Sequence, residues 1–336
     1  MLFDQPVNTL QEGFTGLAWL KFAEMTEGIA RFESSAGTLE VSAPTQDVLR
    51  LRIQRGAMVD YGILVDSDGL ERQAASAGLQ VQDGETIHVK AGLLELVIER
   101  DPVRLSVCRS GEVLLASSDD RTISGGLRLF PLAASEEQWL ISLALESGES
   151  VFGLGEKFGR LDKRGELVES WNRDATGVNA ELSYKNVPFA WSPRGWGVFV
   201  HTTARVFHGV GYPPWSHRSY VIKLDDPTLD LFLIFGDCPA EMLEKYSGLT
   251  GRTELPPRWS YGTWMSRAFY QTADEIMDVA RQLRQHRIPC DVLTLDGRAW
   301  HKAETRFDFT WDTERYPEPA VFVQGLRALD YRLCLW

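Results

Sequence analysis

The chain has 336 residues, 44% of them hydrophobic, and a formal net charge of −12 at pH 7. This acidic balance, without any block of Lys and Arg, argues against a nucleic acid or an anionic membrane surface as a partner. No apolar run approaches the roughly 20 residues that a membrane-spanning helix needs, and residues 1–13 lack the basic-then-apolar order of a secretory signal.

The placement of cysteine and histidine argues against disulfides and metal sites. The cysteines stand singly in apolar or strand-like surroundings, at Cys108, Cys238, Cys290 and Cys334. We therefore expect small buried thiols in a reduced, cytoplasmic setting. The six histidines show no metal-ligand spacing, so no metal is predicted. The loop Gly153–Gly159 resembles a dinucleotide-binding loop, but its last glycine is one residue late and no amphipathic helix can follow, so we predict no cofactor.

Residues 39–235 contain many short alternating strands and almost no helical pattern, which predicts a large antiparallel sandwich. A short helix at 239–246 and a connector at 247–257, rich in Gly, Thr and Pro, come next. We therefore divide the chain into a β-sandwich domain, 1–250, and a second domain, 251–336. The predicted sandwich strands are 47–53, 94–99, 104–108, 113–116, 139–145, 197–201, 220–224 and 229–235, with a hairpin turn at 109–112.

The second domain alternates strand and helix, the pattern of parallel βαβ units. Such a series predicts the start of a (β/α)₈ barrel, a fold of about 250 residues. Three parallel strands would leave an uncapped apolar edge, so we expect the chain to be the N-terminal part of a longer enzyme. The predicted elements are a strand at 261–265, a helix after 272, a strand at 291–296, a helix at 320–329 and a strand at 332–336.

The first helix of this domain has the clearest signal. Thr272 and Glu275 are spaced as a capping box, in which each side chain accepts a hydrogen bond from the other residue's backbone amide. An apolar face follows at the i, i+3, i+4 and i+7 positions 276, 279, 280 and 283. Ile288-Pro289 ends the helix.

Four acidic positions are weighed as candidates for function. Asp296 ends an apolar strand on the barrel face where binding residues collect, although an Asp after a strand is often only a turn former. Asp308 and Asp312 fit loop and cap residues better. On spacing alone, Asp174 is a loop residue in a polar turn.

A series of motifs resembles glycoside hydrolase family 31, the α-glucosidase and α-xylosidase family, from about residue 40 to the end of the chain. Many motifs in the family's order make chance agreement improbable. They are Val151-Phe-Gly-Leu-Gly-Glu156, Trp171-Asn-Arg-Asp174, Tyr184-Lys-Asn-Val-Pro-Phe189, Arg194-Gly-Trp-Gly-Val-Phe199, Tyr261-Gly-Thr-Trp-Met-Ser266, Ile288-Pro289, Asp308-Phe-Thr-Trp-Asp312 and Tyr316-Pro-Glu-Pro319.

The resemblance implies a sandwich related to galactose mutarotase, a (β/α)₈ barrel and C-terminal β-domains. It also implies retaining hydrolysis of α-glucosides or α-xylosides through a glycosyl-enzyme intermediate, for which two carboxyls stand about 5–5.5 Å apart. In the family these are aspartates at the ends of the fourth and sixth barrel strands. Neither position exists in this chain, so we expect no catalytic residue here and an inactive chain.

By the same resemblance, part of the sugar pocket should be present. Asp296 should bind hydroxyls of the sugar in subsite −1, Phe269 and Trp336 should line that subsite, and Asp174 should reach subsite +1. Trp264, placed at the end of the first barrel strand, is either a pocket residue or core.

The segment after Asp296 departs from the family. Gly297-Arg-Ala-Trp300 replaces both the Cys-Phe-Trp run of xylosidases and the Ile-Asp-Tyr-Met run of maltase-type members. Arg298 could meet a substrate carboxylate or sulfonate, or pair with a local acid such as Asp308. The sugar and its linkage stay open, as does a homo-oligomer of the full-length enzyme.

Two rival functions remain. One is a non-catalytic carbohydrate-binding module, with the sandwich as its working part. The other is an isomerase of the mutarotase type, which needs an acid–base pair of His and Glu in the sandwich cleft. His88, His201 and His208 keep this alternative open, although their settings are ordinary strands.

Overall fold

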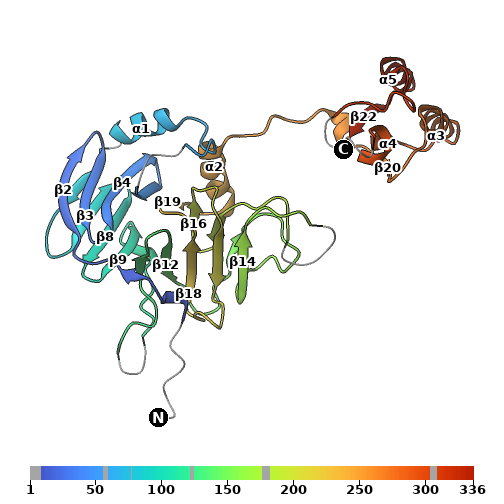
Figure 1. Cartoon of the computed structure of the whole chain (residues 1–336). Coiled ribbons are helices and arrows are strands. Elements are labelled where there is room, and N and C mark those ends of the chain that lie inside the picture. Colours follow the sequence, from blue (N-terminus) through green and yellow to red (C-terminus); the bar gives the residue numbers. More distant parts are fainter. Residues whose placement is uncertain (1–8, 56–59, 77, 122–124, 176–181, 303–308) are drawn as a thin grey trace, which may run out of the picture. The chain divides into compact units, whose positions relative to one another are not determined.

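The computed structural model describes residues 9–55, 60–76, 78–121, 125–175, 182–302 and 309–336. The chain divides into two compact units, Met1–Arg252 and Thr253–Trp336, which are described separately below (Figure 1).

The first unit is built from three antiparallel sheets (Figure 1). The eight-stranded sheet has the order β13 (Phe152–Gly153), β15 (Phe189–Ser192), β16 (Trp196–Val200), β19 (Leu229–Phe235), β5 (Val48–Ile53), β4 (Gly37–Thr45), β3 (Ile29–Ser34) and β2 (Lys21–Thr26). The six-stranded sheet has the order β1 (Thr15–Gly16), β11 (Leu132–Ala134), β12 (Trp139–Ala144), β18 (Ser219–Leu224), β17 (Val206–Val210) and β14 (Glu166–Ser170). The five-stranded sheet has the order β10 (Glu112–Ala116), β9 (Val103–Arg109), β8 (Leu94–Arg100), β7 (Ile87–Ala91) and β6 (Gln80–Gln82).

Strand β5 shows how alternation builds this unit. Leu49, Leu51 and Ile53 are buried in the main core, which also takes side chains from the other two sheets. Arg50 and Arg52 point to the opposite face of the sheet, because successive side chains of a strand point to alternate faces. A smaller cluster, which includes Phe232 of β19 and residues of helices α1 (Ser67–Ser76) and α2 (Pro239–Thr250), lies on that second face.

The second unit has one parallel sheet in the order β20 (Trp264–Arg267), β21 (Val292–Leu295) and β22 (Arg332–Leu335). Helix α3 (Ala273–Gln285) links the first two strands, and α4 (Gly297–Trp300) and α5 (Pro319–Ala328) lie between the last two. The buried faces of α3 and α5 share a core with β21 and with Trp300. The prediction of an antiparallel sandwich followed by the parallel strands of a barrel is confirmed.

Two predictions made from short sequence motifs, the 109–112 hairpin turn and the capping box at the start of α3, can be compared with the structure. The 109–112 hairpin has a two-residue loop with positive φ at both Ser110 and Gly111, as a tight hairpin turn requires. The Thr272 side chain accepts from the Glu275 amide at 3.2 Å, as the capping box predicts. The other half of the box was wrong, because the Glu275 carboxylate accepts from the Gln271 amide at 2.7 Å and pairs with Arg267.

Other boundaries and elements need correction. Helix α1 was not expected, because Leu70 is the only large apolar residue in it. Strands β2 and β3 precede residue 39, where the predicted strands began. Helix α2 continues to Thr250, so the connector is shorter than predicted. Residues 258–261 form a 3₁₀ turn, and β20 therefore begins only at Trp264.

Candidate functional site

The carboxyl ends of the three parallel strands form one edge of the second unit. The register pairs Arg267 with Leu295, and Leu295 with Leu335, so the three strands end side by side. Asp296 and Trp336 are the next residues after β21 and β22, and the Trp336 amide donates to the Leu295 carbonyl at 3.0 Å. Two polar or aromatic side chains therefore come from adjacent strand ends, the arrangement that barrel enzymes use for binding.

Asp296 presents its carboxylate without a local partner. It occupies the position before helix α4, yet its side chain makes no capping hydrogen bond. Among the residues described, this half-buried carboxylate has neither a hydrogen bond nor an ion pair. An ionised carboxylate offers about four acceptor sites, so Asp296 can bind two hydroxyl groups of a ligand.

Gly297 allows two rings to approach the backbone beside Asp296. A Cβ added to Gly297 would lie 3.0 Å from Nε2 of His301 and 3.4 Å from the Trp336 ring. The Trp300 indole also donates to the Trp336 carbonyl at 2.9 Å. Trp336 is thus fixed by its backbone, while 68% of the residue's surface remains exposed at the strand ends.

Phe269 follows β20, in the loop that leads to α3. It is 46% exposed, and its carbonyl accepts from Arg267 Nε at 2.9 Å. The structure therefore brings Asp296, Phe269 and Trp336 to the loops at one edge of one sheet.

Arg315 holds these loops together, a role that no sequence pattern predicted. Its guanidinium donates to the Tyr270 and Ala299 carbonyls, both at 3.2 Å, and to the His301 carbonyl at 2.9 Å. It also pairs with Asp312 at 2.8 Å, and this contact holds the pKa of Asp312 below its usual value. One side chain thus joins the loop after β20 to the last turn of α4 and to the residue that follows this helix.

Replacing Arg315 by methionine should destabilise the second unit by about 2 kcal/mol, because Asp312 loses its charged partner and three carbonyls lose their donor. Arg315→Lys should be nearly as damaging, since a lysine keeps the charge but cannot reach three carbonyls at once. Hydrogen exchange of the 268–273 and 297–302 amides, followed by mass spectrometry, measures the loss of stability in the segments that Arg315 contacts. Unchanged protection in both variants would contradict the role of Arg315.

Asp174 lies in the first unit, on the exposed loop after β14. Its carboxylate accepts a hydrogen bond from the Tyr184 hydroxyl, and this bond raises the pKa of Tyr184. Nearby, Asn186 donates to the Asn172 side chain and to the Trp171 carbonyl, both at 2.9 Å. Asp174 is therefore held by Tyr184, a partner that sequence reasoning missed.

The expectation for Trp264 has a definite outcome. Trp264 begins β20 rather than ending it, so it lies at the edge opposite to Asp296, and placing it at the strand's end was wrong. It is 45% exposed, and its indole donates to the Ser260 carbonyl at 3.1 Å.

Arg298 is exposed and has no ion pair among the described residues. Its expected partner Asp308 lies outside the described residues, so the pairing of these two side chains stays a prediction.

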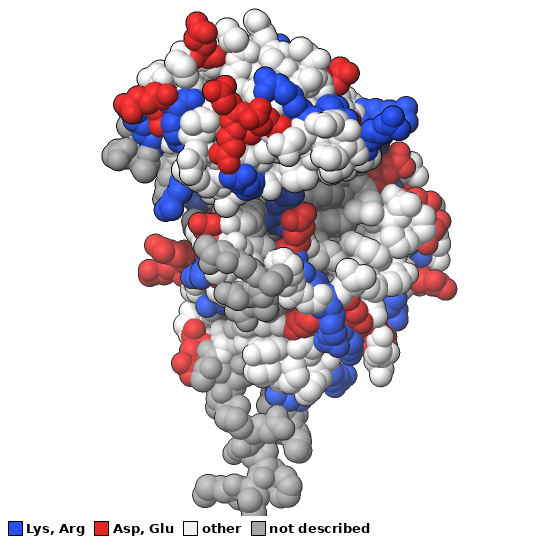
Figure 2. All heavy atoms as spheres, turned by 90° about the vertical axis from the view of Figure 1, so that its right-hand side faces the viewer, with Lys and Arg blue, Asp and Glu red and all other residues white. Residues whose placement is uncertain are grey.

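The described residues carry no cluster of three or more His, Cys, Asp or Glu side chains that could hold a metal ion. Each helix in the described ranges is too short or too polar to span a bilayer. Figure 2 shows one face of the molecule, on which Lys and Arg are interspersed with Asp and Glu rather than gathered into a broad basic area.

Comparison with known proteins identifies both units. Residues 38–208 match the model of the glycosyl hydrolase 31 N-terminal galactose mutarotase-like domain, and residues 253–336 match that of the glycosyl hydrolases family 31 TIM-barrel domain. The α-xylosidase XylQ of Lactiplantibacillus pentosus is 25% identical over 97% of this chain and 42% of its own length. An α-xylosidase of Emericella nidulans is 32% identical, over 59% of this chain and 25% of its length.

Solved structures agree on the fold. The GH31 dextranase of Flavobacterium johnsoniae, complexed with isomaltotriose, superposes with a TM-score of 0.79 at 21% identity, over 95% of this chain and 38% of the dextranase. A GH31 α-xylosidase from a soil metagenome, complexed with xylose, gives a TM-score of 0.74 at 20% identity, over 94% of this chain and 46% of that one. The chain thus spans less than half of each relative named here, and it belongs to glycoside hydrolase family 31.

Proposed function

We propose that this chain is the N-terminal portion of a retaining α-glycosidase that hydrolyses α-linked glucosides or xylosides. The observation that carries the proposal is the strand-end edge, where the unpartnered Asp296 and the exposed Trp336 lie on adjacent parallel strands of a family 31 barrel domain. Asp296 would accept sugar hydroxyls, and the Phe269 and Trp336 rings would stack on the sugar's C–H face. Asp174, on the sandwich loop, would contribute to the neighbouring subsite.

In this proposal the nucleophile and the acid/base come from sequence outside the 336 residues. The described part of the second unit supports this, because Asp296 is the one carboxylate at its strand-end edge that has no ion pair, whereas Glu275 and Asp312 pair with Arg267 and Arg315. Retention needs two catalytic carboxyls. The chain alone would then bind part of a sugar without cleaving it. We also propose a cytoplasmic location, in keeping with four cysteines that are all free thiols.

An activity assay of the purified chain tests the proposal that the chain alone does not cleave sugars. The mass of the sample is first verified as 37.9 kDa. We expect no release of nitrophenol from p-nitrophenyl α-glucoside or α-xyloside, because the proposal places the two catalytic carboxyls of retention outside the chain. Turnover at this mass would show that the catalytic groups lie within the chain.

The protein that contains this chain as its N-terminal part tests the rest. It should hydrolyse one of the two substrates and release the α-anomer first, as proton NMR would show. Asp296→Asn should lower its kcat/KM by about 10²–10³-fold, since two charged hydrogen bonds of about 1.5–3 kcal/mol each are weakened. The exposed Asp278→Asn is the control. Initial release of the β-anomer would contradict the retaining mechanism.

A further inference from the structure

Two exposed segments of the first unit are joined to each other, residues 171–175 after β14 and residues 183–186 before β15. We call them the loop pair. Asn172 and Ser183 form a β-bridge between the two segments, and the Arg173 amide donates to the Ser183 carbonyl at 3.1 Å. The backbones of the loop pair are therefore held together outside the three sheets.

The side chain of Asn186 fastens the loop pair a second time. Its amide group donates to Asn172 Oδ1 and to the Trp171 carbonyl, both at 2.9 Å, and its backbone amide donates to the same Oδ1 at 3.1 Å. The Ser183 hydroxyl donates to Asn186 Oδ1 at 3.1 Å. Groups that are already fixed in this way lose little conformational freedom when a ligand binds, so the loop pair has the property of a preorganised binding surface.

The loop pair carries an exposed phenol that is bonded to an exposed carboxylate. The Tyr184 hydroxyl donates to Asp174 Oδ1, with the Ala175 carbonyl as a second acceptor at 3.1 Å. Tyr184 is 58% exposed, so this hydrogen bond rather than burial in a core holds its side chain. The bond to Asp174 raises the pKa of Tyr184, and the phenol therefore keeps its proton and remains a donor at neutral pH.

This bond makes the two oxygens of Asp174 different. Oδ1 is occupied by Tyr184, whereas Oδ2 has no hydrogen-bond partner among the described residues. A carboxylate oxygen accepts about two hydrogen bonds, so Oδ2 can bind hydroxyl groups of a ligand, and its charge strengthens these bonds. Without Tyr184 the exposed Asp174 side chain would rotate among its rotamers and would present Oδ2 in several directions.

We propose that Tyr184 is a positioning residue, which directs Asp174 Oδ2 toward a hydroxyl of the leaving-group sugar and so gives the enzyme a preference for sugar leaving groups. The inference rests on the proposed function, in which Asp174 contributes to the subsite beside that of the cleaved sugar. It adds the chemical class of the leaving group to that function. Tyr184 does not touch the substrate and acts through Asp174.

The test uses the protein that contains this chain as its N-terminal part, with two substrates that share one sugar. The first is a disaccharide, either maltose, isomaltose or xylosyl-α-1,6-glucose, whose leaving group is a sugar. The second is the matching α-glucosyl or α-xylosyl fluoride, whose leaving group is one atom without a hydroxyl. Tyr184→Phe should lower kcat/KM for the disaccharide about tenfold, because the carboxylate that binds the leaving group loses its orientation. It should leave kcat/KM for the fluoride unchanged, whereas a damaged structure would lower both values.

A double-mutant cycle separates positioning from an independent effect of Tyr184. Asp174→Ala should lower kcat/KM for the disaccharide at least as much as Tyr184→Phe does. The double variant Asp174→Ala/Tyr184→Phe should be no worse than Asp174→Ala alone, because Tyr184 acts only through Asp174. Tyr212→Phe is the matched control, since Tyr212 lies in the same unit and its hydroxyl has no hydrogen-bond partner among the described residues. Its two kcat/KM values should equal those of the wild type.

The possible failures of this inference and of the proposed function are distinct. Equal losses on both substrates in Tyr184→Phe, an unchanged disaccharide value in this variant, or additive losses in the double variant would each overturn the role of Tyr184. If Asp174→Ala alone keeps its preference for the fluoride, the proposed function stands without this inference. Failure of the wild-type protein to hydrolyse either fluoride would overturn the proposed function, and the inference with it.

Discussion

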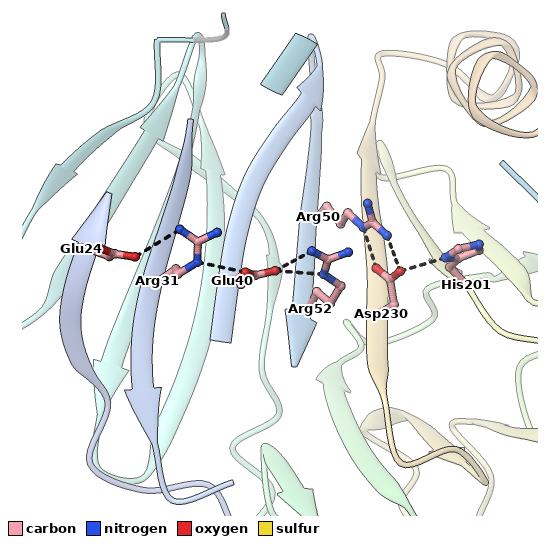
Figure 3. A network of polar contacts seen from close by, with 7 residues as sticks. All are labelled: Glu24, Arg31, Glu40, Arg50, Arg52, His201 and Asp230. Carbon is pink, nitrogen blue, oxygen red and sulfur yellow. Dashed lines mark hydrogen bonds and ion pairs between the residues drawn. The ribbon is translucent and has the colours of Figure 1, made fainter. Parts of the chain in front are cut away.

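Replacing Arg50 by methionine is expected to lower the free energy of unfolding of the first unit by about 3–5 kcal/mol. Arg50 pairs with Asp230 (Figure 3), and the two side chains are only 11% and 4% exposed. Without the guanidinium, Asp230 would be a buried anion held by His201 alone. Urea unfolding followed by far-ultraviolet circular dichroism measures the loss.

Arg52 offers a matched control on the same strand and the same face. It pairs with Glu40, whose side chain is 21% exposed. Water can therefore solvate the Glu40 carboxylate in part when the Arg52 guanidinium is removed. Arg52→Met should therefore cost about 1 kcal/mol. The double variant Arg50→Met/Asp230→Leu should recover much of the loss, because it removes the uncompensated charge. Equal losses at Arg50 and Arg52 would show that burial of the pair is not the cause.

This pair also shows how far sequence reasoning reaches. Alternating leucine and arginine in residues 49–52 predicted a half-buried strand, and the structure has one. The pattern cannot name Asp230, which lies 180 residues away and becomes a neighbour only because β5 pairs with β19. Local periodicity therefore predicts which face a residue occupies, whereas its partner depends on sheet order.

The candidate site in the second unit shows the same limit. The apolar runs predicted the three parallel strands, and the position of Asp296 directly after one of these runs predicted that it lies at a strand end. Trp264 was misplaced because the start of a short strand is set by its partner, here Val292. No sequence pattern predicted the role of Arg315, because three of its partners are backbone carbonyls, which are present at every residue. Residues that organise loops in this way are found only from coordinates.

The first unit should lose stability steeply as the pH falls below about 6.5, and His208 should be a main cause. This imidazole is fully buried between Tyr220, at 2.7 Å from Nδ1, and Ser170, at 3.1 Å from Nε2. Burial, and to a smaller extent the charge of Lys157, lowers the pKa of His208 from 6.5 to about 3. The ring therefore stays neutral in the folded protein at pH values where it is charged in the unfolded chain.

The direction follows from the protons bound by each state. Between pH 6.5 and about 3 the unfolded chain holds a proton on His208 and the folded chain does not, so acid favours unfolding. The stability that His208 contributes is complete above pH 6.5 and falls by about 1.4 kcal/mol per pH unit below it, which amounts to about 3 kcal/mol at pH 4.

Comparing His208→Gln with wild type isolates this contribution, since other titrating groups such as Asp230 are common to both proteins. Urea unfolding at intervals from pH 7.5 to 4 should show the difference in stability between the two proteins shrinking by about 3 kcal/mol as the pH falls. The same substitution at the exposed His217 should follow the wild-type profile. Parallel profiles for wild type and His208→Gln would mean that His208 takes up its proton at the same pH in the folded protein as in the unfolded chain. The Tyr220 and Ser170 hydroxyls would then both have to act as acceptors to a buried cation, because a charged ring has two donors and no lone pair.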